Sequence, residues 1–319
     1  MGCEVTSVYN DEVLGKIGLP QPLIDDLITR DYAASYQLLS PKEVLGRVDR
    51  VYGFNQLSLG CGLFLTTVPG CPEEQYVYVA GRFIVMEGVS GKGKQHIMVS
   101  KDVVTACTVE GGACLVGLRG GGVVLWDLEF REAKIEILLP EGCLIVSSVG
   151  ITPKYLVVTD SSQPNNFIFF YERRTAKMKA FSKIPSLEPV IKSATVRNTH
   201  VTASADGLWF FSERSGEVEV LKGMFGKYPK TSMLCLGASG DYLVSGGVDG
   251  YLYVWRASVG QCIKALRVSE AEVGAIGIGS GHLVIGCWDG KVKAYSFSVT
   301  VTQKKIYNIN IENEEEEPE

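Results

Sequence analysis

The chain has 319 residues, of which 46% are hydrophobic and 36 are glycines, so it can bury a large core. It has no apolar run of about 18 residues or more, which excludes a membrane-spanning helix, and its N-terminus lacks the basic and apolar regions of a secretory signal. Six glutamates among the last eight residues account for the net charge of −5, so the body of the chain is close to neutral and does not indicate a nucleic-acid binder.

Nine cysteines are scattered along the chain, an odd number with no Cys-x-x-Cys pair. Several stand inside apolar runs, where cysteine packs as a small core residue. A chain of this length does not depend on disulfide bonds to fold. The cysteine pattern therefore predicts a reduced, intracellular protein.

The first residues of the chain fit a lipidation pattern. Gly2 follows the initiator methionine and Thr6 completes the N-myristoylation pattern, while Cys3 is a candidate for palmitoylation. Glycine after the initiator methionine is also common by chance. A single myristoyl chain anchors a protein only weakly, so stable attachment to a membrane would require acylation of both Gly2 and Cys3.

An amphipathic segment follows. Pro22 suits the first turn of a helix, and four apolar residues form a stripe behind it: Leu23, Ile24, Leu27 and Ile28. We expect residues 1–44 to form an N-terminal extension with one short helix. That helix would pack on the outside of the following domain, or alternatively dock a partner protein.

Residues 88–95 resemble a phosphate-binding loop without meeting its requirements. They read GVSGKGKQ, with Gln95 where the loop needs serine or threonine to hold magnesium. The residues that follow are strand-like, whereas a phosphate-binding loop leads into a helix N-terminus. We therefore expect a basic surface hairpin and not a nucleotide site.

The strongest pattern in the sequence is a repeated hairpin. Residues 242–257 read YLVSGGVDGYLYVWRA and residues 282–297 read HLVIGCWDGKVKAYSF, each with two strand-like runs around an Asp-Gly pair. Further strand-like runs lie between the hairpins, at residues 233–237 and 273–278. The period is about 40 residues with about four strands per unit. Weaker copies begin at Tyr76, Cys114, Tyr155 and His200.

Three of the hairpins carry Asp-Gly at the turn. This pair predicts a two-residue hairpin turn, because aspartate and glycine tolerate the positive φ angles that such a turn requires. We interpret these residues as structural turn formers. They are Asp206, Gly207, Asp249, Gly250, Asp289 and Gly290.

The repeat predicts an all-β fold, a single WD-repeat-type β-propeller of six or seven blades over residues 45–308. A short N-terminal helical extension precedes it, and a disordered acidic tail follows over residues 309–319. A β-sandwich is the alternative architecture, against which the six copies argue. Residues 299–311 would either complete the first blade or form part of a seventh.

The sequence offers no set of catalytic or ligand-binding residues. His96, His200 and His282 belong to different repeat units, whereas a metal site needs three or four convergent ligands. No serine or cysteine occupies a nucleophile elbow, and no carboxylate pair is evident. We therefore expect no enzymatic activity, no metal and no cofactor.

Three segments resemble the first propeller of the echinoderm microtubule-associated protein-like (EMAP-like) family. Residues 223–236 read GMFGKYPKTSMLCL and residues 271–285 read AEVGAIGIGSGHLVI. Residues 45–84 resemble the hydrophobic HELP-type motif that opens the propeller in this family. The residues of that motif here are Val51, Tyr52, Gly53 and Phe54. Family members commonly carry two propellers and a coiled coil, whereas this chain has room for one propeller and no heptad run.

The resemblance implies a non-enzymatic structural protein that binds microtubules. The expected partners are tubulin and other microtubule-associated proteins, with no nucleic acid, and the expected location is the cytoplasm, the cytoskeleton or the axoneme of a cilium or flagellum. Tubulin has an acidic surface, so contact is expected through the near-neutral body and not the tail. The alternative is a WD-repeat scaffold that assembles a signalling or trafficking complex, tethered to a membrane only if Gly2 and Cys3 are acylated.

Overall fold

The computed structural model describes residues 62–91, 94–162, 166–186, 188, 190–279, 281–301 and 307–313. The chain divides into two compact units, Met1–Asp49 and Arg50–Glu319, and every described residue belongs to the second. The helix predicted within residues 1–44 and the end of the acidic tail, from residue 314 onward, lie outside the described residues.

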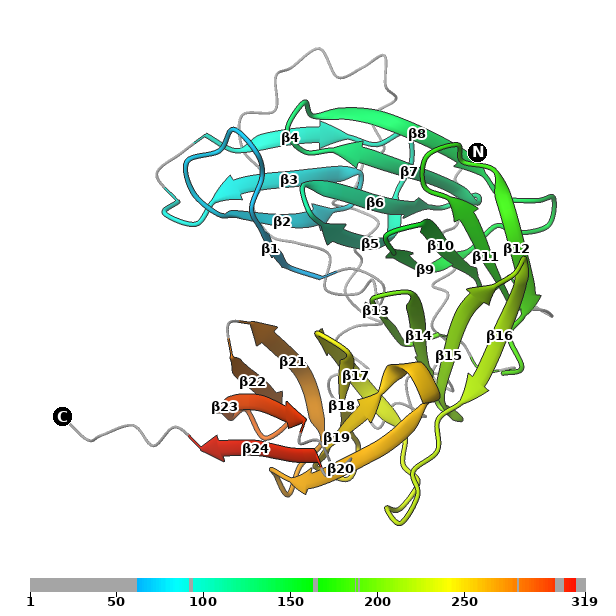
Figure 1. Cartoon of the computed structure of the whole chain (residues 1–319). Helices are drawn as coiled ribbons and strands as arrows, with labels where there is room; N and C mark the ends of the chain where they lie inside the picture. Colours follow the sequence, from blue (N-terminus) through cyan, green and yellow to red (C-terminus); the bar gives the residue numbers. More distant parts are fainter. Residues whose placement is uncertain are drawn as a thin grey trace, which may run out of the picture. The chain divides into compact units, whose positions relative to one another are not determined.

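Within the described residues the chain forms six antiparallel sheets of four strands, and strands that follow one another in sequence are neighbours in each sheet (Figure 1). The first two sheets hold β1 (Phe64–Thr66), β2 (Gln75–Ala80), β3 (Phe83–Gly88) and β4 (His96–Val99), then β5 (Val104–Glu110), β6 (Ala113–Leu118), β7 (Gly122–Asp127) and β8 (Glu132–Leu138). The third and fourth hold β9 (Val146–Ile151), β10 (Tyr155–Asp160), β11 (Phe167–Glu172) and β12 (Met178–Lys183), then β13 (Lys192–Val196), β14 (Thr199–Ser204), β15 (Gly207–Arg214) and β16 (Glu217–Lys222). The fifth and sixth hold β17 (Met233–Ser239), β18 (Tyr242–Gly247), β19 (Tyr251–Arg256) and β20 (Gln261–Arg267), then β21 (Val273–Gly279), β22 (His282–Cys287), β23 (Val292–Val301) and β24 (Tyr307–Asn313).

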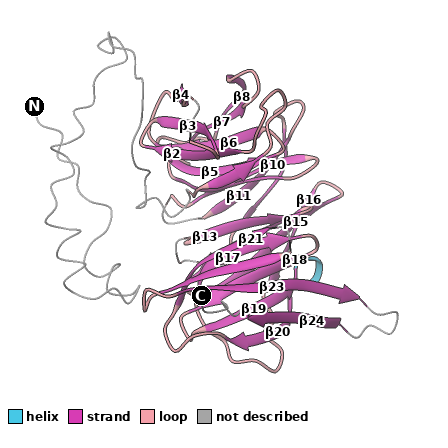
Figure 2. Ribbon diagram, turned by 90° about the vertical axis from the view of Figure 1, so that its left-hand side faces the viewer, coloured by secondary structure: helices cyan, strands magenta, loops and turns pink. Residues whose placement is uncertain are grey.

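The sheets confirm the predicted propeller, with six blades among the described residues. Each predicted hairpin supplies the two middle strands of one sheet, from β2–β3 in the first to β22–β23 in the sixth. Nearly all of the remaining structure is loop, and the one helical element in the described part of the chain is the short turn η1 (Ala257–Val259), as Figure 2 shows.

The placement predicted for residues 299–311 is wrong on both alternatives. These residues neither complete the first blade nor start a seventh, because β23 and β24 pair with each other as the last two strands of the sixth sheet. The ladder places Val299 opposite Ile309 and Val301 opposite Tyr307. This pairing continues the hairpin ladder beyond Phe297.

Neighbouring sheets pack face to face around separate apolar cores. The first strand of each sheet lies innermost, beside the first strand of the next, and the fourth strand lies at the outer edge (Figure 1). One cluster of buried side chains fills each boundary between consecutive sheets, five clusters in the described residues. The fold is therefore a series of cores, each shared by two blades.

Alternation along the strands explains why the repeats are so apolar. In β6, Leu115 belongs to the core shared with the third sheet, whereas the next residue, Val116, belongs to the core shared with the first. Successive side chains of a strand point to opposite faces. Because both faces of a blade are buried, its middle strands need continuous apolar runs and not alternation with polar residues.

The sixth sheet has one face that no other described sheet covers. Its inner face packs on the fifth sheet, but the other face is exposed at Ala275, Gly277 and Gly279 of β21. Val284 and Val292, on the next two strands, are 42% and 72% exposed. Among the described sheets, the sixth therefore buries apolar side chains against a neighbouring blade on one face only.

A buried polar network ties the third sheet to the fourth. The imidazole of His200 is fully buried; its Nδ1 lies 3.2 Å from the Thr195 hydroxyl and its Nε2 lies 3.2 Å from the Ser148 hydroxyl. Burial lowers the pKa of His200 to about 3, so the ring is neutral at physiological pH and uses one nitrogen as donor and the other as acceptor. Gly150 leaves the space for this ring, because a side chain there would collide with it.

We expect the free energy of unfolding to fall as the pH drops below about 6.5, the ordinary histidine value. Below that pH the unfolded chain protonates His200, whereas the folded chain stays neutral at this residue until about pH 3. The contribution of neutral His200 to the free energy of unfolding is therefore fully present above pH 6.5. Below that pH it is lost at up to about 1.4 kcal/mol per pH unit. Denaturant unfolding at pH 7 and at pH 5.5, a window above most carboxyl titrations, measures the slope. In His200→Gln the slope should flatten, and an unchanged slope would assign the loss to other groups.

Candidate functional site

Several residues singled out from the sequence lie outside the described residues. These are the lipidation candidates Gly2 and Cys3 and the residues of the HELP-type motif, Val51, Tyr52, Gly53 and Phe54. Acylation and the motif therefore stay predictions. In the part of the chain that the structure describes, no helix is long and apolar enough to cross a membrane.

The Asp-Gly pairs lie at the turns between the second and third strands of their sheets. Asp249 and Asp289 are each followed by a glycine with positive φ, at +77° for Gly250 and +82° for Gly290. The aspartates themselves do not have positive φ, so these turns differ from the predicted two-residue type. Instead, a carboxylate oxygen of each aspartate accepts a hydrogen bond from the backbone N–H two residues later, at 3.2 Å in both turns.

The third Asp-Gly pair, Asp206 and Gly207, is held by more side-chain hydrogen bonds than the other two. Asp206 precedes Gly207, whose φ is +128°. The Asp206 carboxylate accepts hydrogen bonds from the hydroxyls of Ser186 and Ser204 and from the indole of Trp209. Although burial acts in the opposite direction, these bonds together with Lys222 lower the pKa of Asp206. The turn aspartates thus stabilise hairpins by local hydrogen bonding.

The remaining candidates are spread over the fold. Residues 88–95 connect β3 to β4, so a strand and not a helix follows the loop that resembled a phosphate-binding loop. His96, His200 and His282 lie in β4, β14 and β22, on three different sheets. Within the described residues, no group of three or more His, Cys, Asp or Glu side chains could hold a metal ion.

A groove with a volume of about 690 Å³ lies between the second and third sheets. We call it the blade 2–3 groove. The hairpin turn at Gly111 and Gly112 and the ends of β7 and β8 form one wall; the turn before β10 and the end of β11 form the other. A volume in this range suits a small ligand or a few side chains of a partner.

The two walls combine apolar surface with charge. Leu125 and Ile135 are part of the core shared by the two sheets. Trp126 and Tyr155 also line the groove, but their rings turn to the opposite faces of their sheets: Trp126 packs on the core shared with the first sheet and Tyr155 on the core shared with the fourth. Tyr155 donates its hydroxyl hydrogen to Glu213 of the fourth sheet at 2.6 Å, which contributes most to raising the pKa of Tyr155 to about 12. The phenol is therefore held in place and stays protonated.

Trp126 carries an unusual donor. Its indole N–H is buried and has no hydrogen-bond acceptor among the described residues. A buried donor without an acceptor costs on the order of 1–3 kcal/mol. The ring packs on the core shared by the first and second sheets, so this donor lies on the face of β7 turned away from the groove.

Sequence reasoning missed this groove. Its cations come from three segments: Lys134 in β8, Lys154 in the turn before β10, and a basic run after β11 that reads RRTAKMK from Arg173. The basic run was the available signal. It did not identify a groove because the opposite wall comes from another repeat unit, and nothing in the sequence aligns the two.

Comparisons with known proteins agree with the fold. No protein-family model matches the chain. Guanine nucleotide-exchange factor SEC12 of Mus musculus and that of Rattus norvegicus are each 28% identical to it over 87 residues. The match covers 27% of this chain and only 21% of each relative.

Solved structures match over most of the chain at low sequence identity. U3-55K has a TM-score of 0.57 at 14% identity, covering 82% of this chain and 84% of that chain. The computationally designed Ika8 protein has a TM-score of 0.57 at 16% identity, covering 74% and 71%. The β-propeller domain of Cps50 (Swd1) from Myceliophteria thermophila has a TM-score of 0.51 at 14% identity, covering 66% and 74%.

Likeness at such identities shows the fold alone. These comparisons do not confirm the EMAP-like resemblance or the HELP-type motif, so both stay predictions. The sheets, the repeat and these neighbours together show that the chain is a WD40-type β-propeller with six blades in its described part.

Proposed function

We propose that the protein is a non-enzymatic scaffold that holds a partner protein on its propeller. The observation that carries this proposal is the blade 2–3 groove, a concave surface of mixed apolar and charged character on a rigid stack of sheets. Binding surfaces of this kind combine an apolar floor with a few placed polar groups. Rigid sheets hold such a surface in one shape, which lowers the entropy cost of association.

The partner that we propose is the microtubule. Support comes from the resemblance of residues 223–236 and 271–285 to the EMAP-like propeller, now placed between β16 and β18 and between β20 and β22. With this partner the protein would be a structural protein of the cytoskeleton, in the cytoplasm or in an axoneme. A near-neutral body fits a lattice contact that depends on shape more than on charge.

Co-sedimentation with taxol-stabilised microtubules tests this partner. We expect the purified full chain to pellet with microtubules at micromolar concentration and to stay in the supernatant without them. A chain that ends at Asn313, and so lacks the last glutamates, should pellet at least as well, because tubulin's surface is acidic. If both chains remain in the supernatant, the microtubule is not the partner.

A second candidate function is guanine nucleotide exchange, favoured by the 28% identity to SEC12 over 87 residues. The partner would then be a GTP-binding protein, and Gly2 and Cys3 would tether the scaffold to a membrane if acylated. Faster release of labelled GDP from a GTP-binding protein on addition of the chain would support this candidate. Unchanged release across a panel of such proteins would count against it.

A further inference from the structure

We propose that the blade 2–3 groove binds an acidic, extended peptide segment of the partner protein. This inference rests on the proposed scaffold function and names the chemistry that one of its surfaces recognises. It follows from the balance of charge in the groove, from the position of that charge relative to the apolar floor, and from the size of the groove.

The carboxylates of the groove already have partners. Asp127 forms an ion pair with Lys134 and accepts hydrogen bonds from two backbone N–H groups, so its pKa is lowered even though burial alone would raise it. Glu172 accepts a hydrogen bond from the Thr175 hydroxyl at 2.5 Å and lies 4.0 Å from Lys179. These carboxylates and Lys134 therefore add little net field to the groove.

The remaining cations of the groove have no such partner. Lys154, Arg173 and Arg174 line it, and none of them forms an ion pair with another described residue. Arg173 acts on the carboxyl of Glu110, whose pKa it lowers against the larger, opposite effect of burial. Lys154 in turn is one of the groups that lower the pKa of Glu213, after the hydrogen bond from Tyr155. Two carboxyls thus face three cations, which leaves a small excess of positive charge on the wall formed by the third sheet.

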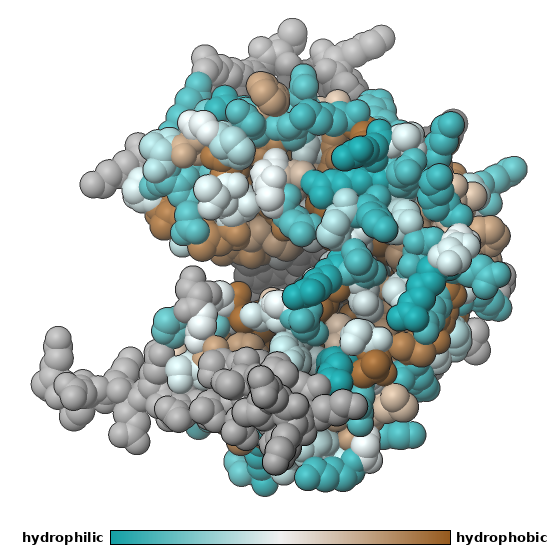
Figure 3. Space-filling view, in the orientation of Figure 1, coloured by the Kyte–Doolittle hydropathy of each residue, from teal (hydrophilic) through white to brown (hydrophobic). Residues whose placement is uncertain are grey.

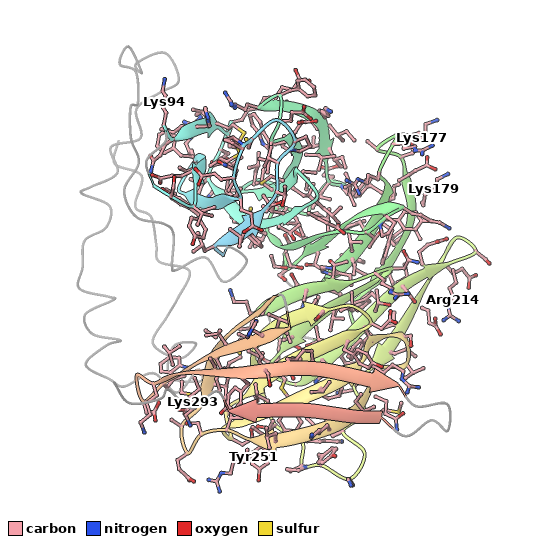
Figure 4. The ribbon with its side chains drawn as sticks, turned by 60° about the vertical axis from the view of Figure 1, so that its left-hand side comes forward. Lys94, Lys177, Lys179, Arg214, Tyr251 and Lys293 are labelled. Carbon is pink, nitrogen blue, oxygen red and sulfur yellow. The ribbon has the colours of Figure 1, made fainter. Side chains whose placement is uncertain are left out.

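The positive wall continues onto the outer surface of the propeller. Lys177 and Lys179 project outward from the third sheet, and Arg214 projects on the same side from the fourth (Figure 4). Many hydrophilic side chains cover this side of the molecule in the space-filling view (Figure 3). Arg214 pairs with Glu219 at 3.0 Å and Lys179 lies 4.0 Å from Glu172, so the charge outside ion pairs is concentrated at Arg173, Arg174 and Lys177.

The shape of the groove favours a peptide over a folded surface or a nucleic acid. About 690 Å³ holds a few side chains, not a domain. Carboxylates of a peptide can reach the arginines while its apolar side chains contact the partly exposed Ile135. A nucleic-acid backbone needs a longer row of cations than Lys154, Arg173 and Arg174, the cations of the groove outside an ion pair.

Fluorescence polarisation with two labelled probes tests the proposal. The first probe is a short peptide that alternates glutamate with leucine, and the second has glutamine in place of every glutamate. We expect the full chain to bind the acidic probe at least tenfold more tightly than the neutral one, with affinity falling as salt rises. Equal binding of the two probes, or no binding of either, would overturn the proposal.

Charge reversal locates the site. Arg173→Glu with Arg174→Glu should weaken binding of the acidic probe at least tenfold, because both guanidinium groups become repulsive. The matched control is Lys227→Glu with Lys230→Glu, which makes the same change of charge in the loop between β16 and β17, outside the groove. The control should bind nearly as well as the unaltered chain, and an equal loss in both double variants would show only a general charge effect. Near-identical thermal unfolding of the two variants would exclude misfolding as the cause.

Two further outcomes separate this inference from the proposed function. Tight binding of a labelled RNA oligonucleotide, lost in the Arg173→Glu and Arg174→Glu variant, would replace the peptide with a nucleic acid and overturn the proposal. If that variant still pellets with microtubules and still binds the acidic probe as well as the unaltered chain, the proposed scaffold function is kept. The blade 2–3 groove is then not the binding site, and this inference is overturned.

Discussion

Replacing Trp255 with alanine should lower the free energy of unfolding by about 4 kcal/mol, the largest single effect that we expect in this chain. The indole is fully buried in the core shared by the fourth and fifth sheets. It packs edge-on against Phe225, with ring centroids 4.9 Å apart, and donates its N–H to the Ser245 hydroxyl at 2.8 Å. Alanine at this position would both leave a large cavity and remove that hydrogen bond.

Denaturant unfolding followed by circular dichroism measures the effect as a shift of the midpoint. Trp288→Ala is the matched control, because this indole is 42% exposed and lies on the sixth sheet. We expect the control to cost clearly less, since most of the contacts of a buried tryptophan are missing there. Comparable shifts for the two variants would show that burial between blades does not govern stability in this fold.

Gly250→Ala should be the second most damaging change, at about 3 kcal/mol, although it adds only one methyl group. The φ of +77° at Gly250 strains any other residue. The added Cβ would also collide with the carbonyl oxygen of Ser269 and lie 2.9 Å from that of Ala271. These are backbone atoms that hold the connection from β20 to β21, so they cannot rotate away.

Gly290→Ala isolates the first of these two causes. Gly290 has the same role in the next blade and nearly the same φ, +82°, but no atom lies within 4 Å of the position that a Cβ would take. We therefore expect a cost of about 1 kcal/mol, from backbone strain alone. The difference between the unfolding midpoints of Gly250→Ala and Gly290→Ala measures the cost of the collision with the Ser269 carbonyl oxygen. Equal losses of stability would mean that the backbone at Ser269 moves aside at no cost.

Much of the fold could be predicted from the sequence because its information is local. Each hairpin lies within one repeat unit, so the apolar runs and turn residues around Asp249 and Asp289 identified the strands without knowledge of distant contacts. The details of the turns could not be predicted in the same way. The aspartates use side-chain hydrogen bonds to the backbone, a geometry that the same Asp-Gly pair allows as readily as the two-residue turn that we expected.

The candidate site was beyond sequence reasoning because it is formed between units. Lys134 and Arg173 come from different repeats, and only the packing of two sheets brings them to one groove. The end of the sixth sheet was missed for a related reason. Whether residues 299–311 extend their own sheet or join another is decided by competition between ladders, and a single strand's sequence does not reveal its partner.

The division of the interior into five cores has a consequence for how the protein opens. Coupling between blades passes only from neighbour to neighbour, as in a one-dimensional chain of units. The sixth blade has its core on one face only among the described residues, whereas the blades in the middle have one on each face. Amide hydrogens in β22 should therefore exchange with solvent deuterium before those in β14, along a gradient that runs inward from the last blade.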